Sequence, residues 1–236
     1  MIYQIMEALL FEQNSSMLFF MYMISGILGA VISVYFLKIY RVISSAHICG
    51  LVIGFALVAF SDFFFSMTID VTNNREIYNV LHWLRLSFVS YGFIVIGLVY
   101  YFKKYTEKKF KMVIKTALIS LIPIGLSLVV TGIGNSFLPD FHQYNEYFRI
   151  LNLVALGYII LKIGSNSELQ TRSDLFVLPV GFGIVFLSQY LRLLFTVDPT
   201  SLTLIISGVL KIAGLGIIII ALARKPKNPV IIKKSF

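Results

Sequence analysis

Charged residues are scarce in this sequence. Asp, Glu, Lys and Arg make up 13% of its 236 residues, whereas hydrophobic residues make up 58%. A soluble domain carries about 25% charged residues, and the mean hydropathy of +0.88 is correspondingly high. The shortage of charge excludes a soluble globular domain. We expect a multi-pass protein of the cell membrane, whose main partner is the lipid bilayer.

Cysteine and catalytic motifs are also lacking. The one cysteine, Cys49, can form no disulfide within the chain. The three histidines, His47, His82 and His142, lie on different segments and lack the spacing of a metal site. Paired carboxylates, an HExxH motif and a Ser/His/Asp set are absent from the apolar segments. We therefore expect no metal site and no enzymatic activity.

Long apolar runs are abundant. A helix needs about 20 apolar residues to cross the hydrocarbon core of a membrane. Seven runs approach or exceed this length: 17–39, 46–67, 77–102, 112–132, 147–163, 175–197 and 202–223. Within the second run, Gly50 and Gly54 have the spacing that permits close helix approach. The prediction is a single domain over residues 1–236, an all-α membrane protein folded as a seven-transmembrane-helix bundle.

Basic residues gather in the connections that an alternating topology places on one side. Residues 103–115 contain six lysines, and residues 224–236 contain Arg224 and four lysines. Cytoplasmic loops are enriched in Lys and Arg, which predicts the N-terminus outside and the C-terminus in the cytoplasm. This placement explains the net charge of +9 without nucleic acid. Both segments also suit binding of a cytoplasmic or membrane signalling partner. Separately, we expect the protein to form a homo-oligomer.

Lys211 lies in the middle of the seventh run. With a helical rise of about 1.5 Å per residue, it lies roughly 13 Å below the nearer membrane surface. A charge at this depth costs at least about 2.5 kcal/mol, so an ionisable residue there suggests a functional site. A desolvated lysine amine can also lose its proton and condense with an aldehyde to form a Schiff base.

Further polar residues share this half of the predicted bundle. Arg85 reaches a similar depth and should face the interior, whereas Asp62 lies roughly 9 Å deep and suits an ion pair with Arg85 or Lys211. His82 and Arg192 lie closer to the surface and are expected to extend toward it. The opposite half is nearly uncharged, which predicts a polar cavity or ion-pair cluster above an apolar plug. Two deep cations with one deep anion indicate that Lys211 is neutral or modified, or that an external anion such as chloride enters.

Several of these features resemble those of microbial rhodopsins. The lone Lys211 is followed by small, glycine-rich residues and a basic end, and in that family the corresponding lysine binds retinal. Pro179 and Phe182 have the character of one wall of the family's retinal pocket. Trp83, two residues before Arg85, is similar to the family's aromatic residue before an arginine. The resemblance implies a retinal site formed by Lys211, Trp83, Pro179, Phe182 and Ser207.

Two departures from the family argue against proton pumping. The family's helix-three counterion, a carboxylate three residues after the arginine, is replaced by Phe88, and a carboxylate four residues before the lysine is replaced by Ser207. A buried Schiff base needs a counter-charge to stay protonated, and Asp62 is the candidate for this role. Ser87 and Ser90 are candidates to help hold a chloride. Outward proton pumping in the family's manner is therefore not expected.

Three functions remain open at this point. The first, which the resemblance implies, is a photosensory protein with retinal on Lys211 that signals through its basic inner segments. The second is a rhodopsin-fold scaffold, chaperone or receptor subunit that has lost retinal, which the missing carboxylates favour. The third is an unrelated transporter or receptor for a small anionic solute, with Arg85, Lys211 and Arg192 as its binding cations.

Overall fold

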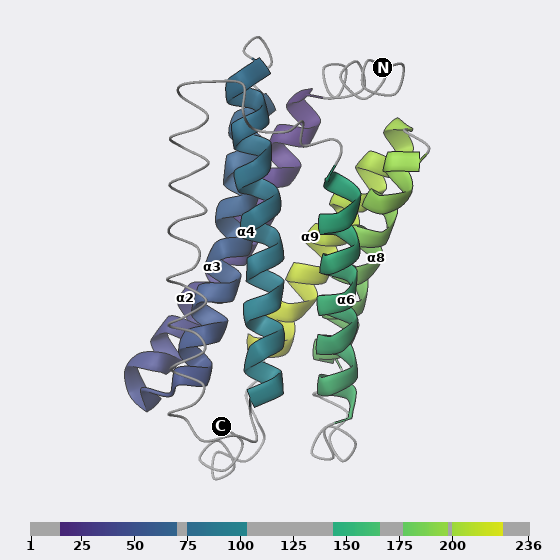
Figure 1. Ribbon diagram of the computed structural model, residues 1–236. Helices are drawn as coiled ribbons and strands as arrows, with labels where there is room; N and C mark the ends of the chain where they lie inside the picture. The colour runs from purple at the N-terminus through teal and green to yellow at the C-terminus, as the bar shows by residue number, and fades with distance from the viewer. Residues whose placement is uncertain (1–14, 70–74, 103–143, 166–176, 198–199, 224–236) are drawn as a thin grey trace.

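The computed structural model describes residues 15–69, 75–102, 144–165, 177–197 and 200–223, which form a bundle of helices. These helices are α2 (Ser15–Ile43), α3 (Ala46–Ile69), α4 (Arg75–Phe102), α6 (Asn145–Gly164), α8 (Val177–Val197) and α9 (Ser201–Ala223) (Figure 1). All six are long and apolar enough to cross a membrane. The chain is therefore a multi-pass helical membrane protein, as its low charge content predicts.

The predicted count of seven membrane-spanning helices is wrong, because the described part of the chain contains six helices and six candidate spans. The predicted run 112–132 lies outside the described residues, as do the basic segments 103–115 and 224–236. Hydropathy alone measures how apolar a segment is, and it contains no information about packing. The predicted orientation rests on the distribution of basic residues and stays a prediction.

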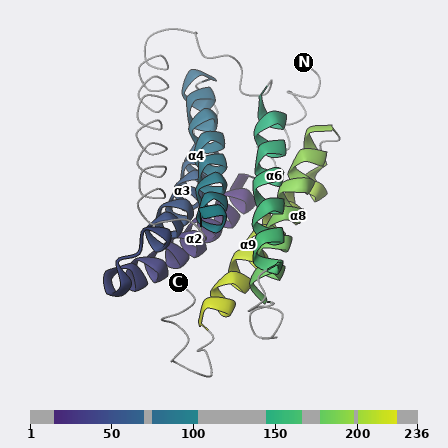
Figure 2. The same ribbon diagram turned by 60° about the horizontal axis from the view of Figure 1, so that its bottom comes forward.

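The six helices form a closed ring. Each described helix packs against the next one along the chain, and α9 closes the ring by packing against α2. The views in Figures 1 and 2 agree that the pair α3–α4 lies opposite the pair α8–α9. The upper end of the bundle in Figure 1 holds the starts of α2, α4, α6 and α9 and the ends of α3 and α8. Residues near these helix ends therefore lie at a common level.

A short turn joins α2 to α3. Ser44 has a φ of 51°, in the left-handed region that often ends a helix. Its N–H donates a hydrogen bond to the carbonyl oxygen of Tyr40 at 2.7 Å, which satisfies one of the carbonyl groups left over at the end of α2. The chain then enters α3 at Ala46, so the two helices lie side by side from the turn onward.

Two helix pairs cross at facing glycines. A Cβ atom added to Gly92 of α4 would lie 2.8 Å from the carbonyl oxygen of Gly54 on α3. A Cβ added to Gly214 of α9 would lie 2.9 Å from the carbonyl oxygen of Gly181 on α8 and 2.7 Å from Cγ2 of Val185. Close backbone contact at small residues is a main source of helix association in membranes. The glycines thus fix how tightly each pair packs.

The interior of the described bundle has three layers. A large apolar cluster, with members from all six helices, fills the lower half. A small apolar cluster lies near the upper end and consists of Leu18, Tyr22, Phe65, Phe195 and Leu204. Buried charged side chains of the pocket, such as Asp62, Arg192 and Lys211, lie between the two clusters, about one helical turn from the small one. The apolar plug expected beneath the deep polar residues is present.

The crossing of α8 and α9 makes a testable prediction. Gly214→Ala should lower the thermal unfolding midpoint in detergent, because overpacking of a close contact costs about 1–3 kcal/mol. Gly216→Ala is the matched control, since no described atom lies within 4 Å of a Cβ there. Alanine has the higher helix propensity by about 1 kcal/mol, so this control should be neutral or slightly stabilising. Equal midpoints for the two variants would contradict the close crossing.

Candidate functional site

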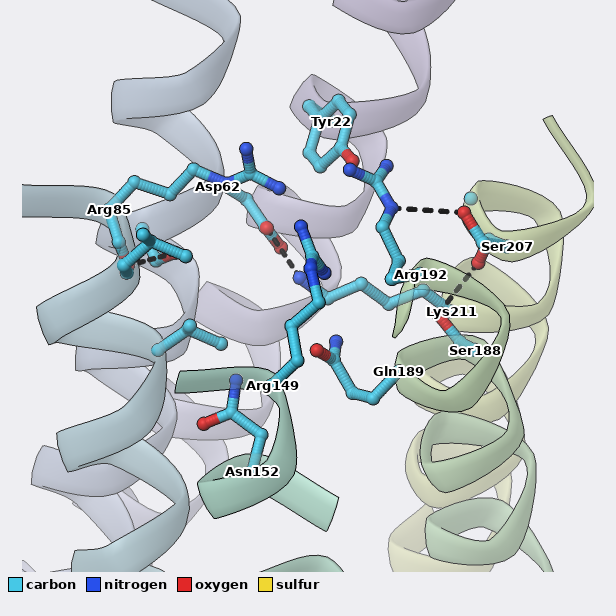
Figure 3. A pocket seen from close by; sticks show the side chains of 14 residues that line it. Tyr22, Asp62, Arg85, Arg149, Asn152, Ser188, Gln189, Arg192, Ser207 and Lys211 are labelled. Carbon is cyan, nitrogen blue, oxygen red and sulfur yellow. Dashed lines mark hydrogen bonds and ion pairs between the residues drawn. The ribbon is translucent and has the colours of Figure 1, made fainter. Parts of the chain in front are cut away.

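A pocket lies between the two apolar clusters and is lined by side chains from every described helix (Figure 3). Its free volume of about 20 Å³ is room for roughly one water-sized particle. The charged residues in its lining are Asp62, Arg85, Arg149, Arg192 and Lys211. The pocket is thus a small, buried and strongly charged space in an otherwise apolar bundle.

Helical periodicity explains how the sequence directs these side chains inward. Residues three or four positions apart lie on the same face of an α-helix. Ser188 and Arg192 have this spacing in α8, and Ser207 and Lys211 have it in α9. The Ser188 hydroxyl donates to the Ser207 carbonyl oxygen at 2.7 Å. These polar positions therefore face each other where α8 and α9 pack.

Lys211 and Asp62 form a buried ion pair in the pocket. Lys211 Nζ donates to Asp62 Oδ1, while the hydroxyl of Ser25 donates to Asp62 Oδ2 at 2.6 Å. Asp62 is 1% exposed and Lys211 is 6% exposed. Of the two partners predicted for Asp62, the structure shows this pairing with Lys211. The contacts of Asp62 connect α2, α3 and α9.

Three arginines surround this ion pair. Arg85, Arg149 and Arg192 come from α4, α6 and α8, and each is between 5% and 8% exposed. Together with Lys211 they place four cations in the lining, where Asp62 is the one carboxylate among the described residues. Each arginine also makes further contacts of its own. Four of the five charged side chains in the described lining are therefore cationic.

Aromatic rings and a serine orient two of these arginines. The guanidinium carbon of Arg85 lies 3.7 Å from the centre of the Phe65 ring, and that of Arg192 lies 4.9 Å from the centre of the Tyr22 ring. These two rings pack edge to face, with centroids 4.1 Å apart. Arg192 Nε also donates to the Ser207 hydroxyl at 3.0 Å. Cation–π attraction holds a guanidinium against a ring face. The N–H groups in the guanidinium plane then point past the ring and can still donate hydrogen bonds.

Several residues predicted from the sequence do meet in the pocket: Lys211, Asp62, Arg85 and Ser207. Arg85 faces the interior, as predicted. Arg192 also lines the pocket, and His82 is 3% exposed with its ring against that of Phe65. The predicted extension of Arg192 and His82 toward the membrane surface is therefore wrong. Neighbouring helices of the ring cover both side chains.

Other predicted residues lie outside the pocket lining. The ring of Trp83 packs against that of Tyr144 at the start of α6, with centroids 5.4 Å apart. Phe182 is buried in the large lower cluster, and Pro179 is buried in the first turn of α8. Ser87 is buried in α4 but does not line the pocket. The structure thus does not gather these four residues around the lysine.

The described lining does not fit retinal. Tyr22 is its one aromatic residue, and a free volume of about 20 Å³ has no room for a long polyene. The amine that would form the Schiff base is bound to Asp62. A photosensory function, implied by resemblance, stays a prediction.

Several lining residues carry no functional prediction from the sequence, among them Arg149, Asn152 and Gln189. Arg149 lies close to the start of the predicted run 147–163, where a basic residue is expected near the membrane surface. The observed α6 begins at Asn145, with Glu146 in its first turn. A carboxylate there stabilises the helix, because it lies near the positive end of the helix dipole. The signal that could have found the site is the three-residue spacing of Arg149 and Asn152 in an apolar helix.

Comparisons with known proteins identify no relative. No family model matches the sequence, and no curated protein or solved structure matches it. The resemblance to microbial rhodopsins therefore rests only on the residues that carry it.

The buried ion pair makes a second prediction. Asp62→Asn should lower the free energy of unfolding by about 3–5 kcal/mol in a medium of large, poorly bound anions, because Lys211 then keeps a buried charge without its partner. Adding Lys211→Met to this variant should recover most of the loss, since replacing a whole buried pair with apolar groups is often neutral. The measurement is reversible unfolding of the detergent-solubilised protein.

Glu146→Gln is the control for this experiment, because Glu146 is an exposed carboxylate at the start of α6. Its effect should stay below about 1 kcal/mol, the usual contribution of an exposed carboxylate at a helix start. A double variant as unstable as Asp62→Asn alone would contradict the ion pair.

Proposed function

We propose that this membrane protein binds a small anion in the pocket and acts as a receptor or transporter for an anionic solute. The observation that supports the proposal is the charge of the lining, in which cations from four helices surround a single carboxylate among the described residues. Such a lining can hold a small anion through charge-assisted hydrogen bonds.

The lining also offers hydrogen-bond donors. Arginine binds carboxylates and phosphates through two parallel N–H groups. Tyr22 Oη and Asn152 Oδ1 have no hydrogen-bond partner within the described helices, although buried polar atoms are normally satisfied. The Tyr22 hydroxyl can donate to an anion, and rotation of the Asn152 amide by about 180° presents its NH₂ group at the same place. Both groups suit a polar ligand.

The size of the pocket indicates the kind of anion. A free volume of about 20 Å³ holds roughly one water-sized particle. A halide or a single carboxylate group is only slightly larger and therefore needs less rearrangement than a large organic anion.

The layers of the bundle also suggest a route. The small upper cluster is a thin barrier on one side of the pocket, whereas the large cluster fills the other half. Entry would require a local opening of the upper cluster, as with the lids of other closed sites.

Anion binding can be measured as stabilisation of the folded protein. We expect chloride and acetate, titrated into a gluconate medium, to raise the unfolding free energy by about 2.7 kcal/mol at a hundredfold excess over Kd. Arg149→Gln should weaken this binding by about tenfold or more, because hydrogen bonds to charged groups contribute about 1.5–3 kcal/mol. Lys162→Gln, an exposed change at the far end of α6, should leave the affinity unchanged.

The outcome that contradicts the proposal is no stabilisation by either anion, or the same loss of affinity in Arg149→Gln and Lys162→Gln. Where binding is observed, uptake of radiolabelled chloride into protein-containing vesicles distinguishes a transporter from a receptor. A transporter accumulates the label, and a receptor binds it without accumulation.

An absorption spectrum separates this proposal from retinal binding. The free volume beside Lys211 is small, and its amine faces Asp62. We therefore expect the protein expressed with all-trans retinal to have the same spectrum as Lys211→Ala. A visible or near-ultraviolet band that disappears in Lys211→Ala would support retinal binding and count against the anion site.

A further inference from the structure

Asp62 is held by two separate contacts. Its Oδ2 accepts a hydrogen bond from Ser25 of α2 at 2.6 Å, whereas its Oδ1 is bound by Lys211 of α9. Because the two contacts use different oxygen atoms and different helices, losing one does not require losing the other. The Ser25 contact can therefore hold the carboxylate while Lys211 changes its partner.

The Asp62 carboxylate already occupies the kind of place that a dissolved anion would seek. It is bound to an ammonium group in a lining that also contains three arginines. The remaining free volume is about 20 Å³, so an ion larger than a water molecule must displace something in order to bind. Separating Asp62 from Lys211 would both make room and leave the ammonium group available.

We infer that Asp62 is a tethered anion that competes with the dissolved anion for Lys211. Binding of the dissolved anion transfers Lys211 from Asp62 to the ligand, while Ser25 keeps hold of the carboxylate. This inference rests on the proposed anion site and adds its regulation. Without ligand, Asp62 neutralises the lysine and joins α3 to α9; with ligand, that connection is broken.

The inference gives anion binding a structural consequence. The pair formed by Asp62 and Lys211 joins two helices that lie far apart in the sequence, and the ring closes where α9 packs against α2. A ligand shifts a conformational equilibrium only through contacts that differ between the two states. Exchange of the Lys211 partner is such a difference, because it removes an interhelical contact when the ligand binds.

The test compares chloride binding by the wild-type protein and by Asp62→Asn, both purified as full chains in detergent and titrated in a gluconate medium. Asparagine keeps the shape of the side chain and can still accept from Ser25, but it carries no charge. The affinity for chloride should rise by about tenfold or more in Asp62→Asn, because the competing charge is removed. Glu146→Gln removes an exposed carboxylate and should bind chloride like the wild type.

The outcomes are distinguishable. If the wild type binds chloride and Asp62→Asn binds it equally or more weakly, the competition is wrong while the anion site stands. If neither protein binds chloride or acetate, the anion site itself is wrong and the inference falls with it.

A second measurement does not depend on the folding of Asp62→Asn. Infrared difference spectra of the wild-type protein, labelled with carbon-13 aspartate, should show a shift of one aspartate carboxylate band when chloride replaces gluconate. Ser25→Ala assigns the band to Asp62, because it removes a hydrogen bond to that carboxylate. An Asp62 band that does not move on chloride binding would overturn the inference.

Discussion

An ammonium group in the middle of a membrane helix needs an opposite charge nearby, and in this protein Lys211 of α9 finds it on α3. The cost of an unmatched charge at that depth is several kcal/mol, so the position of Asp62 constrains how the helices can be arranged. The contact between Ser25 and Asp62 adds α2 to the same connection. The contact between α2 and α9 that closes the helix ring is thus stabilised by the Asp62 ion pair and hydrogen bond as well as by packing.

The layered interior follows from the same requirement. Charged side chains tolerate an apolar bundle only where they gather and satisfy one another, so they form one layer between two apolar clusters. The glycine crossings at Gly54 and Gly92 and at Gly181 and Gly214 bring backbones close below this layer. The closely packed pairs α3–α4 and α8–α9 lie on opposite sides of the ring, so side chains fill the space between them. At the level of the pocket these side chains include arginine, lysine and aspartate.

The cations of the lining give the pocket its proposed chemistry, and Asp62 gives it a proposed regulation. Cation–π contacts with Phe65 and Tyr22 hold Arg85 and Arg192 in defined orientations, so less ordering remains to be done when a ligand binds. A tethered carboxylate lowers the affinity for dissolved anions but keeps the empty pocket stable. The same residue therefore links the stability of the bundle to occupation of the pocket.

The sequence by itself determined that this chain is a helical membrane protein, because apolar composition and run length report directly on the solvent around a helix. It also singled out Lys211, Asp62 and Arg85, because an ionisable residue deep in an apolar run is costly and is rarely present without a structural or functional role. It predicted seven spans, whereas the described residues contain six, and it expected Arg192 at the membrane surface. Only the tertiary structure decided that Lys211 pairs with Asp62, and that Arg149 and Arg192 face the same pocket. Which helices become neighbours, and where each one begins, depends on packing between segments that are distant in the sequence.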